Sequence, residues 1–119
     1  KKYNCIAWAA ASNNQWWWPD SMGIYYWPKN VQREETKEAF VAAYGTIGYV
    51  ECENGDYEES FEKITVYFKD GKPTHAARLK EKDIWTSKLG EGHDIDHAFD
   101  LLDGPAYGRP EFFMKRKIK

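Results

Sequence analysis

The fold is decided by one stretch near the middle of the chain, Lys63-Ile64-Thr65-Val66-Tyr67-Phe68-Lys69-Asp70-Gly71. Apolar residues alternate with more polar ones before the turn, and this period of two is typical of a β-strand with one buried face. The dipeptide Asp70-Gly71 favours a tight hairpin turn, because both residues tolerate the positive φ values that such turns need. The stretch therefore predicts a half-buried strand followed directly by its antiparallel partner.

A third strand extends this hairpin into a meander. The chain returns through residues 73–79 and, after a second turn, continues through residues 84–89. A three-residue loop between these two strands would place Ser87 opposite His75, with both side chains on one face. A two-residue loop would bring Lys88 to that position instead. We expect the three-residue loop, because it surrounds Ser87 with apolar neighbours.

Two helices are expected before the sheet. Asn4 is a favourable N-cap, and the Ala-rich segment 5–11 behind it predicts a buried helix. Residues 33–44 have an amphipathic pattern that ends at a following glycine, which predicts the second helix. Residues 12–30 combine turn formers with large aromatic side chains and predict a long loop between the helices.

The remaining segments complete the expected fold. Residues 49–52 and 112–114 are predicted strands, and residues 95–102 a short helical turn. The order helix, loop, helix, sheet predicts an α+β architecture, with the helices on one side of an antiparallel sheet. Because 119 residues suit one compact domain, we expect a single domain over residues 1–119.

The composition indicates a globular domain and excludes several classes of function. Hydrophobic residues make up 42% of the chain and aromatic residues 17%, which argues against a disordered segment. A net charge of -2 predicts no nucleic-acid partner, and no apolar run approaches the roughly 18 residues of a membrane span. The two cysteines, Cys5 and Cys52, are expected to be free thiols. The oligomeric state and the localisation stay open, with the cytoplasm as the first expectation.

Cys5 is the candidate nucleophile. A thiol in the first turn of a helix lies near unpaired backbone N–H groups and the positive end of the helix dipole, which lower its pKa. Such a thiol also needs a base, and His75 is the histidine expected on a strand. The alternative is that Cys5 is a small core residue and His75 a structural histidine bonded to the backbone.

The first predicted helix also carries a family resemblance. The segment Asn4-Cys5-Ile6-Ala7-Trp8-Ala9-Ala10 resembles the helix start of small bacterial papain-like cysteine hydrolases of the CHAP and NlpC type. The resemblance implies a papain-like fold, a Cys5–His75 pair and Ser87 as the polar third catalytic residue. It implies an amidase or peptidase that forms an acyl-enzyme and needs no cofactor. The backbone N–H of Cys5, together with the Asn4 or Gln15 amide, would stabilise the oxyanion.

A second resemblance leaves room for a silent member of the fold. The same start, together with Trp85-Thr86-Ser87-Lys88-Leu89-Gly90, is similar to an uncharacterised bacterial family that has no established activity. The alternative function is therefore a catalytically silent papain-like domain that binds a peptide or glycan through its Trp-rich loop.

The tryptophans supply the candidate binding surface. The chain has six of them, and those of the loop cannot all be buried together with its tyrosines in so small a domain. Because flat aromatic faces stack on sugar rings and ligand planes, Trp17, Trp18 and Trp27 are predicted to line a groove for a peptide or peptidoglycan-like substrate. The alternative is a self-packed loop that holds the helices in place.

A metal site is the weakest alternative. His93 and His97 have the i, i+4 spacing that places two imidazoles on one helix face, and Asp94 stands where metalloproteases of this pattern carry glutamate. An aspartate is too short for that role, and no third ligand lies nearby. We therefore expect no metal.

Overall fold

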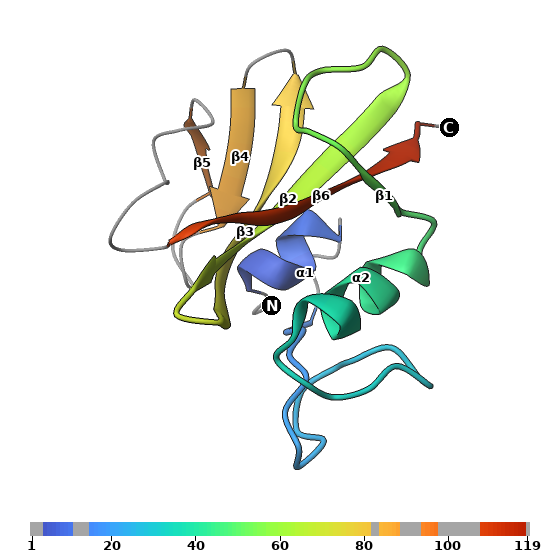
Figure 1. Cartoon of the computed structure of the whole chain (residues 1–119), viewed down its shortest axis with the longest axis vertical. Coiled ribbons are helices and arrows are strands. Elements are labelled where there is room, and N and C mark those ends of the chain that lie inside the picture. Colours follow the sequence, from blue (N-terminus) through green and yellow to red (C-terminus); the bar gives the residue numbers. More distant parts are fainter. Residues whose placement is uncertain (1–3, 11–14, 82–83, 89–93, 98–107, 119) are drawn as a thin grey trace.

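The structure, a computed structural model, describes residues 4–10, 15–81, 84–88, 94–97 and 108–118. Within these residues, two helices pack on one face of an antiparallel sheet, which confirms the predicted α+β class (Figure 1). Neither described helix has the length and apolar character needed to cross a membrane.

The sheet has six strands within the described residues, in the spatial order β1-β6-β2-β3-β4-β5. They are β1 (Val50–Cys52), β2 (Phe61–Lys69), β3 (Lys72–Glu81), β4 (Ile84–Lys88), β5 (Asp94–His97) and β6 (Arg109–Lys117). The predicted last strand is confirmed and proves longer than expected. It lies between β1 and β2, so the last described strand is an interior strand of the sheet.

The hairpin that defines the fold is formed as predicted, but its first strand is not half-buried, because residues 63–67 are buried on both faces of the sheet. Strands β2 and β3 pair antiparallel, and the turn residues Asp70 and Gly71 have φ values of 53° and 79°. A two-residue turn with positive φ at both positions matches the right-handed twist of the flanking strands. The local sequence at this turn therefore fixes the pairing of two long strands.

The predicted register of the next hairpin is wrong. Strand β3 continues to Glu81, and Leu79 pairs with Trp85. The turn between the strands therefore lies closer to the C-terminus than the predicted loop does. In this register, Ser87 lies opposite Ala77 and not opposite His75. The observed register sets Leu79 beside Trp85, and both side chains are buried. Burial of the large indole favours this pairing over the expected one.

The segment predicted as a helical turn at 95–102 is a strand in its described part. Residues Asp94–His97 form β5, which pairs antiparallel with β4 and sets Ile95 opposite Ser87. The ladder pairs the backbone groups of β5 that face β4, which outweighs the weak helical pattern. The rest of the predicted turn, residues 98–102, lies outside the described residues.

Both helices begin where a side chain caps them. Helix α1 (Cys5–Ala9) starts after Asn4, whose Oδ1 accepts the Ala7 N–H at 3.0 Å, as predicted. Helix α2 (Lys37–Gly45) starts later than expected, because the Thr36 hydroxyl caps it by accepting the Ala39 N–H at 3.2 Å. The cap therefore sets where α2 begins.

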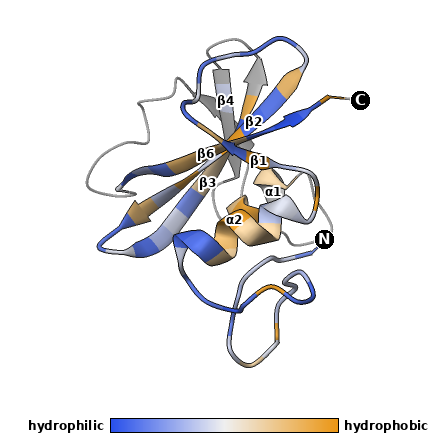
Figure 2. Ribbon diagram, turned by 45° about the vertical axis from the view of Figure 1, so that its right-hand side comes forward, coloured by the Kyte–Doolittle hydropathy of each residue, from blue (hydrophilic) through white to orange (hydrophobic). Residues whose placement is uncertain are grey.

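The two faces of the sheet are buried differently. The main core lies between the sheet and the helices, and its largest members include Ile6, Phe40, Tyr44, Ile64 and Met114. Figure 2 shows apolar segments, coloured orange, on α2 and on the strands of the sheet. A smaller cluster on the opposite face holds Tyr67, Ala77, Leu79 and Trp85, with Phe113 packed against it.

The segment between β1 and β2 approaches this smaller cluster closely. A Cβ atom at Gly55 would lie 2.8 Å from the Phe113 ring and 2.9 Å from the Trp85 ring. Glycine is therefore required for the backbone to contact the two rings.

Candidate functional site

Cys5 lies at the start of α1, packed against the main core. Although the residue keeps part of its surface exposed, desolvation by the surrounding core raises the pKa of its thiol to about 11. Hydrogen bonds with backbone groups, that of Ala76 first, lower this pKa but do not compensate. The shift is opposite to the one expected for a nucleophile, because a helix of five residues has too small a dipole to offset burial.

His75 lies on β3 with its ring on the other side of the sheet. It pairs with Tyr67, and the two ring centroids are 5.9 Å apart. Tyr67 belongs to the smaller cluster, whereas the neighbouring Ala76 belongs to the main core beside α1. Because successive strand residues point to opposite faces, Cys5 meets β3 on the face that His75 does not occupy.

The third predicted catalytic residue, Ser87, lies in the backbone of β4, where it pairs with Ile95. The register of β3 and β4 places it level with Ala77, two residues from His75. The structure therefore does not bring Cys5, His75 and Ser87 together.

Asn4 acts as a buried hydrogen-bonding centre. Its Oδ1 accepts the Ala7 and Trp17 N–H groups at 3.0 and 3.1 Å, and its Nδ2 donates to the Trp17 carbonyl at 2.6 Å. Its side chain thus joins α1 to the aromatic loop. All of these groups are directed into the protein, so they position the loop and do not face a ligand.

The predicted tryptophan groove is largely filled by the protein itself. Trp17 and Trp27 are only 4% and 5% exposed. Trp27 packs edge-on against Phe40 with a centroid distance of 5.1 Å, and half-buried Trp18 packs against the same ring at 6.0 Å. These three indoles match the alternative prediction, a loop that packs on itself and on the helices. They hold the loop against α2.

The tip of this loop is held rigidly. The Asp20 carboxylate accepts the Ile24 and Tyr25 N–H groups at 2.7 and 3.0 Å. Arg33 donates from Nη1 to the Asp20 carboxylate and carbonyl and from Nη2 to the Tyr25 carbonyl, each at 3.0 Å. Desolvation raises the pKa of Asp20, but the two N–H groups and the Arg33 charge outweigh it and lower this pKa overall.

The clamped tip carries the largest exposed apolar side chains of the loop. Met22 and Ile24 are 81% and 72% exposed, and Tyr25 and Tyr26 are 42% and 41% exposed. Figure 1 shows the 15–33 segment projecting past α2, away from the sheet. The exposed apolar surface of the loop is therefore at residues 21–26, which we call the tip, and not at its tryptophans.

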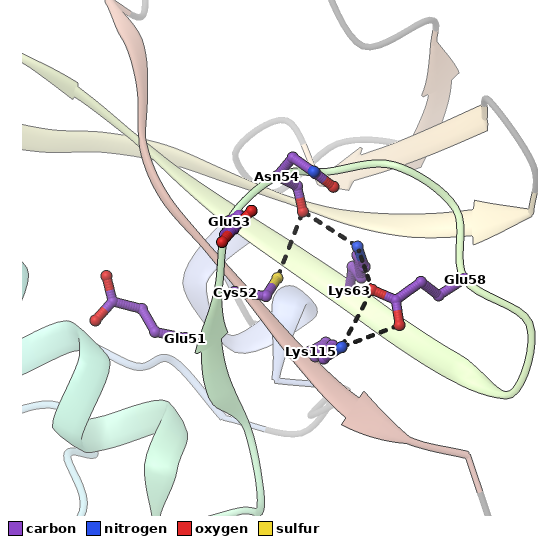
Figure 3. A pocket seen from close by; sticks show the side chains of 7 residues that line it. All are labelled: Glu51, Cys52, Glu53, Asn54, Glu58, Lys63 and Lys115. Atoms are coloured by element: carbon purple, nitrogen blue, oxygen red, sulfur yellow. Dashed lines mark hydrogen bonds and ion pairs between the residues drawn. The ribbon is translucent and has the colours of Figure 1, made fainter.

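A second candidate site lies where β1 meets the following segment. A pocket of about 340 Å³ is lined by Glu51, Cys52, Glu53, Asn54, Glu58, Lys63 and Lys115 (Figure 3). The Cys52 thiol donates to the Asn54 carbonyl at 3.4 Å, and Lys63 Nζ donates to the same oxygen at 3.2 Å. A thiol and an ammonium group therefore lie around one carbonyl.

The described residues contain no cluster of His, Cys, Asp or Glu that could hold a metal ion. His97 lies on strand β5, so the helical spacing on which the metal alternative depended is not formed there. Its predicted partner His93 lies outside the described residues.

Both surfaces were missed by reasoning from sequence, although part of the signal was present. Asp20 followed by Gly23 is typical of a turn in which the carboxylate accepts later N–H groups. That pattern could have indicated an ordered tip. By contrast, the approach of Lys63 to Cys52 depends on β6 inserting between their strands, which no local pattern predicts.

Comparison with known proteins places the chain in a family. No curated protein and no solved structure shows significant similarity to it. One family model, described as a domain of unknown function (DUF7689), matches residues 1–115. Because the match covers nearly the whole chain, the protein belongs to the DUF7689 family.

Proposed function

We propose that this chain is a non-catalytic binding module whose tip, residues 21–26, inserts into an apolar site on a peptide or protein partner. One observation carries the proposal: the Met22 and Ile24 side chains, 81% and 72% exposed, project from a backbone that Asp20 and Arg33 hold in place. Exposed apolar surface of this kind marks interaction sites.

The chemistry of the tip favours a peptide over a glycan. Its sequence, Ser-Met-Gly-Ile-Tyr-Tyr, carries no charge, and the two most exposed side chains are Met22 and Ile24. Aliphatic side chains gain free energy by filling apolar pockets, whereas sugars are bound by exposed flat rings. The indoles suited to sugar stacking, Trp17 and Trp27, are buried.

The ordered backbone also supports binding. A loop that is already fixed loses little conformational entropy when a partner engages it. Arg33 donates its hydrogen bonds to Asp20 and to the Tyr25 carbonyl. These bonds fix the backbone of the tip and do not cover its exposed apolar side chains. The clamp thus acts as preorganisation.

The competing proposal is a papain-like cysteine hydrolase with Cys5, His75 and Ser87. It draws on the element order and the helix start of the sequence. The raised pKa of Cys5 and the position of His75 on the other face of β3 weigh against it. A papain-like domain without activity remains compatible with the binding proposal.

The proposal is tested with a displayed library of random peptides. Peptides selected on the wild-type chain are measured by fluorescence anisotropy against Met22→Ser/Ile24→Ser and against the matched control Val50→Ser/Tyr57→Ser. The control removes apolar side chains that are 59% and 45% exposed elsewhere. We expect the tip variant to bind at least about tenfold more weakly, since interface anchors contribute about 1–3 kcal/mol each, and the control to bind as the wild type does.

Two further measurements decide between the alternatives. Equal affinity for the tip variant, or binding to phosphatidylcholine vesicles without any peptide binding, would overturn the proposal. Turnover of a chromogenic amide that disappears in Cys5→Ser would replace it with the hydrolase.

A further inference from the structure

The pocket beside Cys52 holds an unusual group of charges. Lys63 is buried, with 1% of its side chain exposed, and its Nζ lies 3.1 Å from the Glu58 carboxylate. Lys115 Nζ lies 3.1 and 3.0 Å from the two oxygens of the same carboxylate. Two ammonium groups thus share one carboxylate, which neutralises only one of their charges.

The other acids of the pocket do not remove this excess. Glu51 forms an ion pair with Lys37 at 3.2 Å, and Figure 3 shows its carboxylate turned away from the lysines. Glu53 is exposed at the rim of the pocket, where water screens its charge. The Cys52 thiol therefore lies beside excess positive charge.

The charges act on the thiol itself. Desolvation by burial raises the pKa of Cys52 above its ordinary value and outweighs the Lys63 and Lys115 charges, which lower it, and the Glu58 charge raises it further. The positive groups thus favour the thiolate and any negatively charged group that approaches it. The half-buried sulfur lines the pocket, so a small reagent can reach it.

We propose that Cys52 is a modification site for small disulfides that carry negative charge, and that Lys63 and Lys115 attract them. The Cys52 thiol loses its proton to solvent, and the thiolate attacks one sulfur of the disulfide. A bond from Cys52 to that sulfur forms as the original S–S bond breaks, and the departing thiolate takes a proton from solvent. The incoming disulfide is the oxidant, so no other reagent is needed.

The geometry defines the selectivity of this site. Lys115 keeps 28% of its side chain exposed at the pocket, so it can contact a carboxylate on the reagent. A cationic disulfide of similar size would meet the same two ammonium groups and be repelled. Cys5 provides a comparison within the same chain, because burial raises the pKa of its thiol to about 11 and no lysine of the described residues is among the groups that shift it.

The experiment compares glutathione disulfide, which is anionic, with cystamine, which is cationic. The reduced chain is incubated with each at low ionic strength and neutral pH, and peptide mapping by mass spectrometry gives the rate at Cys52 and at Cys5. We expect glutathione disulfide to modify Cys52 at least about fivefold faster than cystamine does, and 1 M salt to reduce the ratio because it screens the charges. Cys5 should react more slowly with both.

Charge variants test the role of the lysines. Lys115→Gln should lower the ratio toward unity, and the exposed control Lys72→Gln should leave it unchanged. Glu58→Gln should raise it, because it removes the negative charge that opposes the two lysines beside the thiol. Far-ultraviolet circular dichroism verifies that each variant is folded. If Glu58→Gln does not fold, the comparison of Lys115→Gln with Lys72→Gln still tests the role of the lysines.

Three results would overturn the proposal. The first is equal or faster modification of Cys52 by cystamine, and the second is modification of Cys5 at the same rate as Cys52. The third is a ratio that Lys115→Gln and Lys72→Gln change equally.

Discussion

Cys5 contacts strand β3 from one face of the sheet, and the side chain of His75, a residue of β3, lies on the other face. The thiol lies on the helix side beside Ala76, and the imidazole lies on the other side beside Tyr67. A strand thus separates the two groups that an acyl-transfer reaction would need in contact. Burial on the helix side of the sheet raises the pKa of this thiol to about 11.

Cys5 alkylation should report this separation. In a Cys52→Ser background, the rate with iodoacetamide should rise about tenfold per pH unit from about pH 7 to pH 10, since the thiolate fraction does so below the pKa. The rise should level off near the pKa of about 11. His75→Gln should leave the profile unchanged. A plateau near neutral pH that the histidine variant abolishes would restore the catalytic pair.

Tyr44 links the two helices. Its hydroxyl donates to the Ile6 carbonyl at 2.9 Å within the core. Tyr44→Phe should lower the free energy of unfolding by about 1 kcal/mol, the usual contribution of one hydrogen bond. Tyr57→Phe, at an exposed position, should have no measurable effect. Urea denaturation followed by tryptophan fluorescence measures both, and equal effects would contradict the link.

Gly55 should not tolerate a methyl group. The added Cβ of Gly55→Ala would meet the rings of Phe113 and Trp85 at less than 3 Å, and overpacking of this kind costs about 1–3 kcal/mol. Gly45→Ala, at the end of α2, meets nothing within 4 Å and should be neutral or stabilising by about 0.5–1 kcal/mol. The melting temperatures of both variants measure these effects. If Gly55→Ala does not lower the melting temperature, the smaller cluster can rearrange to accept the methyl group.

Glu58 should make part of the stability depend on acid pH. Hydrogen bonds from Lys115 and then Lys63 lower its pKa below the unfolded value. Its contribution is therefore complete above the unfolded pKa and is lost as the pH falls through the lowered folded pKa. Glu58→Gln should be less stable than the wild type at neutral pH, and the two curves should converge below the folded pKa. The exposed Glu59→Gln serves as the control, and parallel curves for Glu58→Gln would refute the linkage.

Local patterns predicted the elements whose cause is local. Asp70 and Gly71 form the hairpin because their backbone conformations suit the turn, and Asn4 caps α1 through its own side chain. Each of these needs only residues that are neighbours in sequence. The capping of α2 by Thr36 is equally local, although the predicted start lay a few residues earlier.

Features that depend on distant residues were not predicted. The register of β4 differs from the predicted one and buries Trp85 in a cluster with Tyr67 and Phe113. These three rings come from three different strands. Whether an indole is buried likewise depends on what the fold places above it, as Phe40 does for Trp27. The prediction of an activated thiol at Cys5 likewise used only neighbouring residues, whereas desolvation by the assembled core raises the pKa of this thiol.

The insertion of β6 between β1 and β2 sets an order for assembly during synthesis. Strand β1 has no partner in the described sheet other than β6, so it waits for residues that the ribosome adds more than fifty positions later. Until then β2 presents an open edge to other nascent chains, and pairings of such long sequence separation are slow to form. A stop codon before β6 should therefore yield an aggregation-prone product rather than a smaller folded domain.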